Sequence, residues 1–312
     1  MSVIYIKNYS RKNKGRIYLI VFELIAIILL LTGAGRISQS KKTLIAQTSQ
    51  SQPVVLGEST KVSITPTNSP LPSPIPTQIT LPSPTLTITP TITPIQVLAK
   101  KTYSIAIIGD SMVDTMGERL EYLEKELKKQ YPKNDFQLYN YGIGSETVEM
   151  GINRLDKEFQ YQDRKYTSLT NLKPDILIVA SFAYNPFFPY DRNKHWLLLA
   201  SLIEKAKKIS PQIYTLAEIA PLGKNFGKGP GGVNWSEDTA FTHAKRIIEQ
   251  LENMVGLSSN LNVPLIDAFH LSQNGNSEFG KQQYVNSNDG IHPSVAGHEF
   301  MAEQIVKKLK FD

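Results

Sequence analysis

Short apolar runs alternate with longer amphipathic stretches over the last two thirds of the chain. The apolar runs are typical of buried strands, and the amphipathic stretches have helical spacing. The predicted strands are Tyr103–Ile108, Phe136–Tyr139, Asp175–Ala180, Gln212–Ala217 and Val263–Asp267. The predicted helices are Gly117–Gln130, Thr147–Phe159, His195–Ile209, Ser236–Leu257 and Ser294–Leu309.

Strands that are separated by helices predict one α/β domain over residues 100–312. Its expected architecture is a three-layer α/β/α sandwich, with a five-stranded parallel sheet covered by helices on both faces. A segment of this length can bury a substantial core. In such a fold, ligands bind at the carboxyl ends of the strands.

An apolar segment near the amino terminus is the candidate membrane span. The 19 residues between Arg16 and Arg36 contain one charged residue, Glu23. As a helix they would extend roughly 28 Å, close to the hydrocarbon thickness of a bilayer. Residues 17–35 are therefore predicted to be a transmembrane signal anchor. The alternative is a cleaved signal peptide, because Thr32-Gly33-Ala34 offers small residues to a peptidase.

Basic residues before this segment set its expected orientation. By the positive-inside rule, residues 1–16 form a cytoplasmic tail and the remaining chain lies outside. Residues 36–99 form the predicted disordered linker, and 28 of the 49 residues from 48 to 96 are Pro, Thr or Ser. Such a composition favours extended, polyproline-like structure and serves as a stalk or as a substrate for O-glycosylation.

The positive net charge of the chain belongs to its amino-terminal end. Residues 1–46 carry eight Lys and Arg and one Glu, whereas residues 97–312 carry 25 basic and 26 acidic residues. A nearly neutral domain is not expected to bind nucleic acid, which requires clustered cations. The absence of Cys excludes disulfides, thiolate metal sites and a cysteine nucleophile.

Polar residues follow the first predicted strand and precede the last predicted helix. Gly109-Asp110-Ser111 stands at the end of that strand, and Asp289 and His292 stand three apart before the helix. This spacing lets Asp289 hold Nδ1 of His292, so that the other ring nitrogen can take the proton of Ser111. The alternative is purely structural: a common turn at Ser111, and a turn at Asp289 that starts a helix capped by Ser294.

The two motifs together resemble those of the SGNH hydrolases, also called GDSL-type esterases. The resemblance rests on Gly109-Asp110-Ser111 and Asp289-x-x-His292-Pro293, and it spans the whole predicted domain. It implies a flavodoxin-like fold and a catalytic triad of Ser111, His292 and Asp289. No cofactor is implied, and no His, Asp or Glu cluster has the spacing of a metal site.

Two middle blocks of that family supply its oxyanion hole. Asn140–Thr147 resembles the block with a glycine N–H donor, and Gly144 is the residue we assign, although Ser145 occupies the glycine position in strict register. Asn185 matches the asparagine of the third block, Gly-x-Asn-Asp, with Ala183 and Pro186 in place of its glycine and aspartate. The resemblance therefore implies an oxyanion hole of Ser111, Gly144 and Asn185. The alternatives are a tight turn at Gly144 and an Asx-turn at Asn185.

Other candidate residues have weaker signals. Structural roles are expected for Asp114, Asp267, His195, His243, His270 and His298, with contact to the site as the alternative for Asp114 and Asp267, which lie near strand ends. Aromatic residues between Phe182 and Trp196 either contact substrate or anchor a long loop. The five glycines between Gly223 and Trp235 favour a mobile lid or a surface loop, and no phosphate-binding motif is present.

These observations predict a membrane-anchored, extracytoplasmic serine esterase. Its expected partners are an acylated small molecule or glycan, with O-acetyl esters of the cell envelope as the resemblance implies, and the membrane through residues 17–35. One alternative is an O-acyltransferase that uses the same triad. The other is a non-catalytic, stalked binding module, which the altered Ala183 and Pro186 motivate.

Overall fold

The computed structural model describes residues 98–311. The predicted cytoplasmic tail, membrane anchor and nearly all of the predicted linker lie outside the described residues. Within the described part, no helix combines the length and the apolar character that crossing a bilayer requires.

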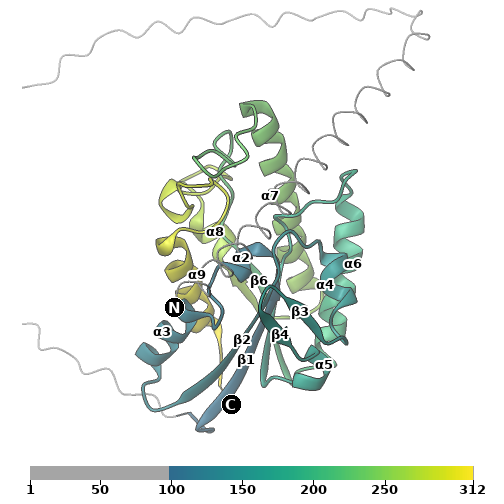
Figure 1. The fold of residues 1–312 in the computed structure, drawn as a ribbon, viewed down its shortest axis with the longest axis vertical. Helices are drawn as coiled ribbons and strands as arrows, with labels where there is room; N and C mark the ends of the chain where they lie inside the picture. Colours follow the sequence, from purple (N-terminus) through teal and green to yellow (C-terminus); the bar gives the residue numbers. More distant parts are fainter. Residues whose placement is uncertain (1–97, 312) are drawn as a thin grey trace, which may run out of the picture. The chain divides into compact units, whose positions relative to one another are not determined.

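A five-stranded parallel sheet forms the centre of the domain (Figure 1). Its strands are β1 (Thr102–Gly109), β2 (Asp135–Gly142), β5 (Ile176–Ala180), β6 (Gln212–Ala217) and β7 (Leu265–Asp267). Their spatial order is β2-β1-β5-β6-β7, which is the flavodoxin-like arrangement. The predicted α/β class and the five-stranded parallel sheet are thus confirmed.

The buried pattern of each strand follows its place in the sheet. All five residues of the central strand β5 are buried, so its sequence is continuously apolar. The edge strand β2 alternates between exposed and partly buried residues over its first half. Because the central strands are continuously apolar, the prediction located them well. Because β2 alternates, the prediction found only its part Phe136–Tyr139.

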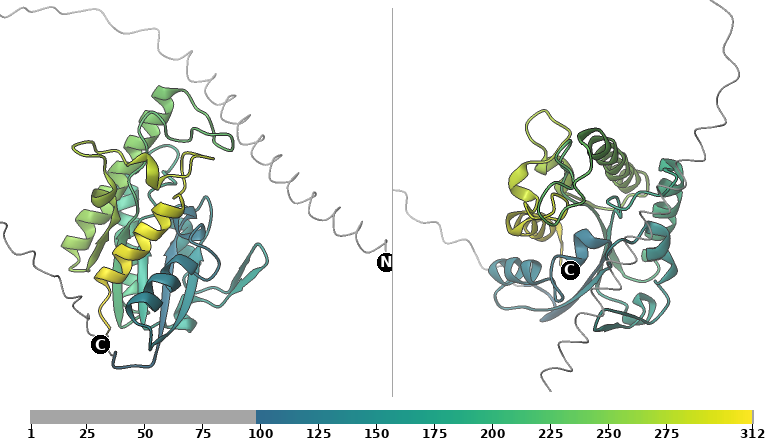
Figure 2. Two further views of the ribbon diagram at one scale, coloured as in Figure 1. Left: turned by 90° about the vertical axis from the view of Figure 1, so that its left-hand side faces the viewer. Right: turned by 45° about the horizontal axis from the view of Figure 1, so that its top comes forward.

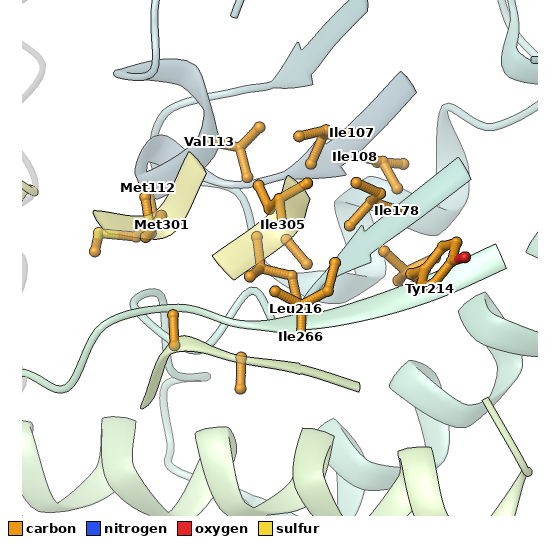
Figure 3. Close-up of a cluster of buried hydrophobic side chains, with 14 of the residues drawn as sticks. Ile107, Ile108, Met112, Val113, Ile178, Tyr214, Leu216, Ile266, Met301 and Ile305 are labelled. Atoms are coloured by element: carbon orange, nitrogen blue, oxygen red, sulfur yellow. The ribbon is translucent and has the colours of Figure 1, made fainter. Parts of the chain in front are cut away.

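Helices cover both faces of the sheet (Figure 2). On one face α3 (Glu121–Gln130) contacts α9 (Val295–Lys308), and on the other α6 (Arg192–Ala206) contacts α4 (Val148–Asn153) and α7 (Glu237–Asn260). Short elements complete the domain: α2 (Ser111–Asp114), α5 (Leu169–Leu172), α8 (Ala268–Ser272) and the 3₁₀ helix η1 (Gln282–Tyr284). Side chains of α2, α9 and the strands meet in the core, where Ile305 and Met301 lie near Met112 and Leu216 (Figure 3).

Two predicted helices differ from the structure. The helix predicted over Thr147–Phe159 ends at Asn153, and an antiparallel hairpin of β3 (Phe159–Tyr161) and β4 (Arg164–Tyr166) follows it. Phe159 stacks on Tyr166 with a centroid distance of 4.5 Å, so cross-strand aromatic contact stabilises the hairpin. The helix predicted from Gly117 begins only at Glu121, because Leu120 has a left-handed backbone with φ of 55°.

Candidate active site

Ser111 lies at the carboxyl end of β1, where the chain turns into α2. Asp110 caps this helix, and its Oδ1 accepts a hydrogen bond of 2.9 Å from the Met112 N–H. A side chain at Gly109 would approach Val113 Cγ2 to 2.4 Å, so only glycine lets the helix follow the strand this closely. As the first helical residue, Ser111 has one of the N–H groups that an α-helix leaves without an intrahelical partner.

Asp289 and His292 lie in the turn before α9. The Asp289 Oδ1 accepts hydrogen bonds from the N–H groups of Ile291 and His292, at 2.8 and 3.0 Å. The Asp289 Oδ2 lies 2.9 Å from His292 Nδ1. With a carboxylate as acceptor, Nδ1 carries the proton and Nε2 is left as a base. The turn therefore fixes the position and the tautomer of this imidazole.

Ser111 and His292 line a common pocket of about 360 Å³. The other lining residues are Ser145, Thr147, Tyr184, Asn185, Pro186, Phe226, Trp235, His243 and Ile291. None of them is Asp, Glu, Lys or Arg. Among the described residues no hydrogen bond joins Ser111 Oγ to His292, and in hydrolases this contact often tightens only around bound substrate.

Asn185 reaches the same pocket from the loop after β5. Its Nδ2 donates a hydrogen bond of 3.1 Å to Asp110 Oδ2. An amide nitrogen carries two hydrogens, so the second one remains for a ligand in the pocket. Asp110, next to the serine, thus orients the side chain that the sequence matched to the third block.

The loop before Asn185 has a left-handed residue, but not at Ala183, the position of the family glycine in the third block. Phe182 is fully buried with φ of 56°, a conformation that costs a non-glycine residue roughly 1–2 kcal/mol. Its ring lies where Gly151 of α4 has no side chain, since a Cβ there would approach Phe182 Cζ to 2.5 Å. The left-handed residue is therefore Phe182, and Ala183 needs no glycine conformation.

A buried carboxyl group holds this loop from the end of β6. Glu218 Oε1 accepts a 3.1 Å hydrogen bond from the Ser181 N–H, and Oε2 accepts one from the Ser181 hydroxyl. The same hydroxyl accepts a 3.1 Å hydrogen bond from the Ala183 N–H. The Tyr184 hydroxyl donates to the Ile219 carbonyl at 2.8 Å. Three polar contacts thus tie the loop that carries Asn185 to the end of the neighbouring strand, and a fourth lies within the loop.

Asp110 and Glu218 are both fully buried. Burial raises the pKa of Asp110 to about 6, and the hydrogen bonds from Met112 and Asn185 oppose that shift. Burial raises the pKa of Glu218 to about 8, and the negative charge of Asp110 adds to this rise. At neutral pH the pair therefore favours one ionised and one protonated carboxyl group, with the proton on Glu218.

The block after β2 presents Ser145 to the pocket. The N–H of Gly144 donates a 3.2 Å hydrogen bond to the Tyr161 hydroxyl, which itself donates to Asp114 Oδ2 at 3.0 Å. Ser145 is exposed, lines the pocket and has φ of 63°. The N–H of the predicted donor Gly144 is therefore already hydrogen-bonded. Ser145, which stands in strict register with the family glycine, has a backbone conformation that glycine adopts readily.

The match to a family model shows which protein family this chain belongs to. Residues 105–305 match the model described as GDSL-like Lipase/Acylhydrolase. The chain belongs to this family. It is a serine ester hydrolase by that membership, and the predicted resemblance is confirmed.

The chain is also similar to solved structures of hydrolases. Axe2, an acetylxylan esterase from Geobacillus stearothermophilus, is 16% identical, with 67% of this chain and 95% of that chain covered and a TM-score of 0.47. A lipase/acylhydrolase from Enterococcus faecalis is 17% identical, with 67% and 98% covered and a TM-score of 0.48. No curated protein matches the chain at a significant level.

A buried ion pair connects the motifs of the GDSL-like domain. Arg154 Nε donates to Glu146 Oε2 at 2.7 Å, and its Nη2 donates to the carbonyls of Gly109 and Tyr141. One guanidinium therefore joins the ends of β1 and β2, which carry the serine and the block with Ser145. The periodicity of the sequence contained no sign of this arginine.

The residues with weaker signals have structural contacts, with one exception. Asp114 pairs with Arg164 at 2.6 Å, and Asp267 accepts from His270 at 2.8 Å. His195 contacts the Ser181 carbonyl, and His298 stacks on Tyr122. His243 is the exception, because it lines the pocket beside Ser111. Among the described residues, no group of three or more His, Asp or Glu side chains could hold a metal ion.

The glycine-rich segment after β6 packs against the turn that carries Asp289. Gly227 donates its N–H to the Gly290 carbonyl at 2.9 Å, and Gly231 donates to the Asn288 carbonyl at 2.7 Å. A Cβ at Gly229 would approach the Asn288 oxygen to 2.3 Å. The glycines therefore serve close backbone contact, and the segment brings Phe226 and Trp235 to the pocket.

Proposed function

We propose that the protein is a membrane-anchored, extracytoplasmic esterase that hydrolyses a short acyl ester, an O-acetyl group, on a cell-envelope glycan. The observation that carries the proposal is the meeting of Ser111 and His292 in one pocket, with Asp289 on Nδ1 of His292. Nucleophile, base and orienting carboxylate are the parts that acyl transfer through a serine requires.

The catalytic steps follow from these positions. His292 Nε2 accepts the hydroxyl proton as Ser111 Oγ attacks the ester carbonyl, forming a tetrahedral intermediate. The imidazolium, held by Asp289, then protonates the departing alcohol, which leaves an acyl-serine. Water attacks this ester in the second half of the cycle, with His292 again as base, and acetate and the free serine are formed.

Three donors are available for the oxyanion. They are the Ser111 N–H at the start of α2, the free amide hydrogen of Asn185 and the N–H of Ser145. We assign Ser145 in place of Gly144, because the Gly144 N–H is bonded to Tyr161. One such donor is typically worth about 3 kcal/mol of activation energy.

The size of the pocket supports a small acyl group. Its volume of about 360 Å³ is near the lower end for ligand pockets, which leaves little room for a long lipid chain beside an alcohol. The anchor predicted over residues 17–35 supports the location outside the cytoplasm, because basic residues precede it. A glycan ester of the envelope is the substrate that meets both conditions.

Hydrolysis of p-nitrophenyl acetate by the purified protein tests the proposal. Ser111→Ala and His292→Ala should each abolish most activity, because the members of a proton-transfer unit are non-additive. A fluorophosphonate probe should label the wild type and not Ser111→Ala. The exposed Ser259, far along α7, supplies the matched control Ser259→Ala, which should keep both activity and labelling.

The same assay separates the alternatives. Addition of a sugar acceptor that yields an acetylated sugar in preference to acetate would identify a transferase. Undiminished hydrolysis in Ser111→Ala would remove the central claim. A folded protein that binds glycans but shows neither hydrolysis nor labelling would be a binding module.

A further inference from the structure

A second imidazole, that of His243 on α7, stands in the same pocket as the catalytic histidine. Its ring packs against two aromatic rings of the glycine-rich segment, with centroid distances of 5.1 Å to Phe226 and 4.9 Å to Trp235. Among the described residues, neither ring nitrogen of His243 makes a hydrogen bond. The proposed reaction uses none of these three side chains.

The imidazole of His243 is neutral at physiological pH. Burial lowers its pKa to about 4, and the nearby Arg246 contributes in the same direction. A neutral imidazole has one donor and one acceptor nitrogen. Because a partly buried polar group loses free energy when it is left without a partner, water or a ligand must satisfy these nitrogens.

We infer that His243, Trp235 and Phe226 form a subsite for the neutral, hydroxyl-bearing alcohol of the ester. The inference deepens the proposed function and rests on it. The imidazole would exchange a hydrogen bond with a hydroxyl group next to the ester, while the indole offers an apolar face to a sugar ring.

The chemistry of the ester assigns the subsite to the alcohol side. An acetyl group has a methyl and a carbonyl oxygen, and the oxyanion donors take that oxygen. Only the alcohol then has groups that a neutral donor and acceptor can recognise. The pocket lining has no Asp, Glu, Lys or Arg, which favours an uncharged sugar over a phosphorylated or carboxylated one.

Several neighbouring polar groups are already engaged. The Tyr184 hydroxyl is engaged by the Ile219 carbonyl, and the second oxygen of Asp289 is engaged by His292. Asn185 has one hydrogen on Asp110 and the other for the oxyanion. With the hydroxyls of Ser145 and Thr147, His243 is one of the pocket side chains that the proposed reaction leaves free both as donor and as acceptor, and it is the one that packs against Phe226 and Trp235.

Two substrates distinguish this subsite from the catalytic groups. The full-length protein is assayed with a monoacetylated methyl glucoside and with p-nitrophenyl acetate, whose alcohol has no hydroxyl substituents. His243→Phe keeps an aromatic ring against Phe226 and Trp235 but loses both nitrogens. We expect kcat/KM for the acetylated glucoside to fall roughly 3- to 10-fold, the value of one neutral hydrogen bond, with hydrolysis of p-nitrophenyl acetate unchanged.

Matched variants make the result specific. His270→Phe changes an exposed histidine on α8 and should alter neither rate. His243→Gln retains a donor and an acceptor and should recover part of the loss. Replacing the free hydroxyls of the glucoside by methoxy groups should lower the wild-type rate and remove the difference between wild type and His243→Phe.

A binding measurement keeps this inference separable from the proposed function. In Ser111→Ala, titration with the acetylated glucoside is followed by tryptophan fluorescence, and adding His243→Phe should weaken binding roughly 3- to 10-fold. Equal losses on both esters, or unchanged glucoside hydrolysis and binding, would overturn the subsite while Ser111-dependent hydrolysis stands. Loss of Ser111 dependence with binding still sensitive to His243 would overturn only the esterase.

Discussion

At Asn185, one hydrogen of the side-chain amide is bonded to Asp110 and the other faces a pocket that also contains Ser111. A donor in this position contributes mainly where negative charge develops, in the transition state. Asn185→Ala should therefore lower kcat about 10²–10³-fold and change KM little. Steady-state kinetics on p-nitrophenyl acetate measure this.

Labelling by fluorophosphonate and an unchanged melting temperature would show that the Asn185 variant is folded with its serine in place. Full kcat in Asn185→Ala would mean that backbone donors alone form the oxyanion hole. Asn185 is the most informative residue of the third block, because Ala183 and Pro186 stand where the family has glycine and aspartate.

Ser145 has a backbone conformation that glycine adopts at no steric cost. Ser145→Gly should relieve the strain of the left-handed backbone, which raises the free energy of unfolding. Glycine also loses more chain entropy on folding, which offsets part of this gain, so the net increase is up to about 1 kcal/mol. Activity should persist, since the proposed donor is the backbone N–H. Urea unfolding and steady-state kinetics together check this.

A large loss of kcat in Ser145→Gly would assign a role to the serine hydroxyl instead. The exposed control is Gln162→Gly, at the tip of the β3–β4 hairpin, where φ is 56° and no pocket residue is involved. It should gain stability in the same way without any change in kcat.

At the scale of elements, the end of β6 holds the loop that follows β5. Glu218 binds Ser181 through both carboxyl oxygens, and the structure places its pKa at about 8 against an ordinary value of 4.5. The folded state therefore binds a proton that the unfolded chain has released, so stability falls as pH rises from about 4.5 to about 8.

Glu218→Gln should remove much of this pH dependence. Glutamine can accept from the Ser181 N–H and donate to its hydroxyl, without a charge beside Asp110. The variant should be more stable than the wild type at pH 8–9, with a difference that shrinks toward pH 5. Thermal unfolding across this range measures it, and a parallel fall in both proteins would show that Glu218 is not the titrating group.

Glu218→Ala is the complementary variant, because it removes the acceptor of the Ser181 N–H and hydroxyl, and that hydroxyl in turn holds the Ala183 N–H. We expect a lower kcat that resembles the effect of Asn185→Ala, since the loop would no longer hold Asn185 against Asp110.

At the scale of the whole molecule, the proposed location depends on residues 1–97. If residues 17–35 are an uncleaved anchor, the protein should remain with membranes after a high-salt wash. Protease added to intact cells should cut the Pro- and Thr-rich linker and release a fragment of roughly 25 kDa. The soluble fragment should keep its esterase activity, because the pocket lies wholly within residues 111–292.

Protection of the domain inside intact cells would contradict the proposed orientation. Release of the full domain without protease would instead indicate the cleaved signal peptide that Thr32-Gly33-Ala34 permits. Either result leaves the chemistry of the pocket unchanged.

The amino-acid sequence by itself determined the family, the fold class and the position of most elements. Buried parallel strands are continuous apolar runs, so the periodicity of the chain locates them. The Asp289–His292 contact was also predictable, because a turn of three residues brings the two side chains together without help from the rest of the fold. The catalytic roles of these residues remain predictions that the variants above test.

Only the tertiary structure decided the finer composition of the pocket. The choice between Gly144 and Ser145 depends on Tyr161, which a hairpin without helical periodicity brings to the Gly144 N–H. The backbone of the loop with Ala183 in place of the family glycine depends on Gly151 of α4 and on Glu218, which directly follows β6. His243 lines the pocket because α7 begins directly after the glycine-rich segment. These contacts join residues far apart in the chain, and no local pattern of hydrophobic and polar positions encodes such distances.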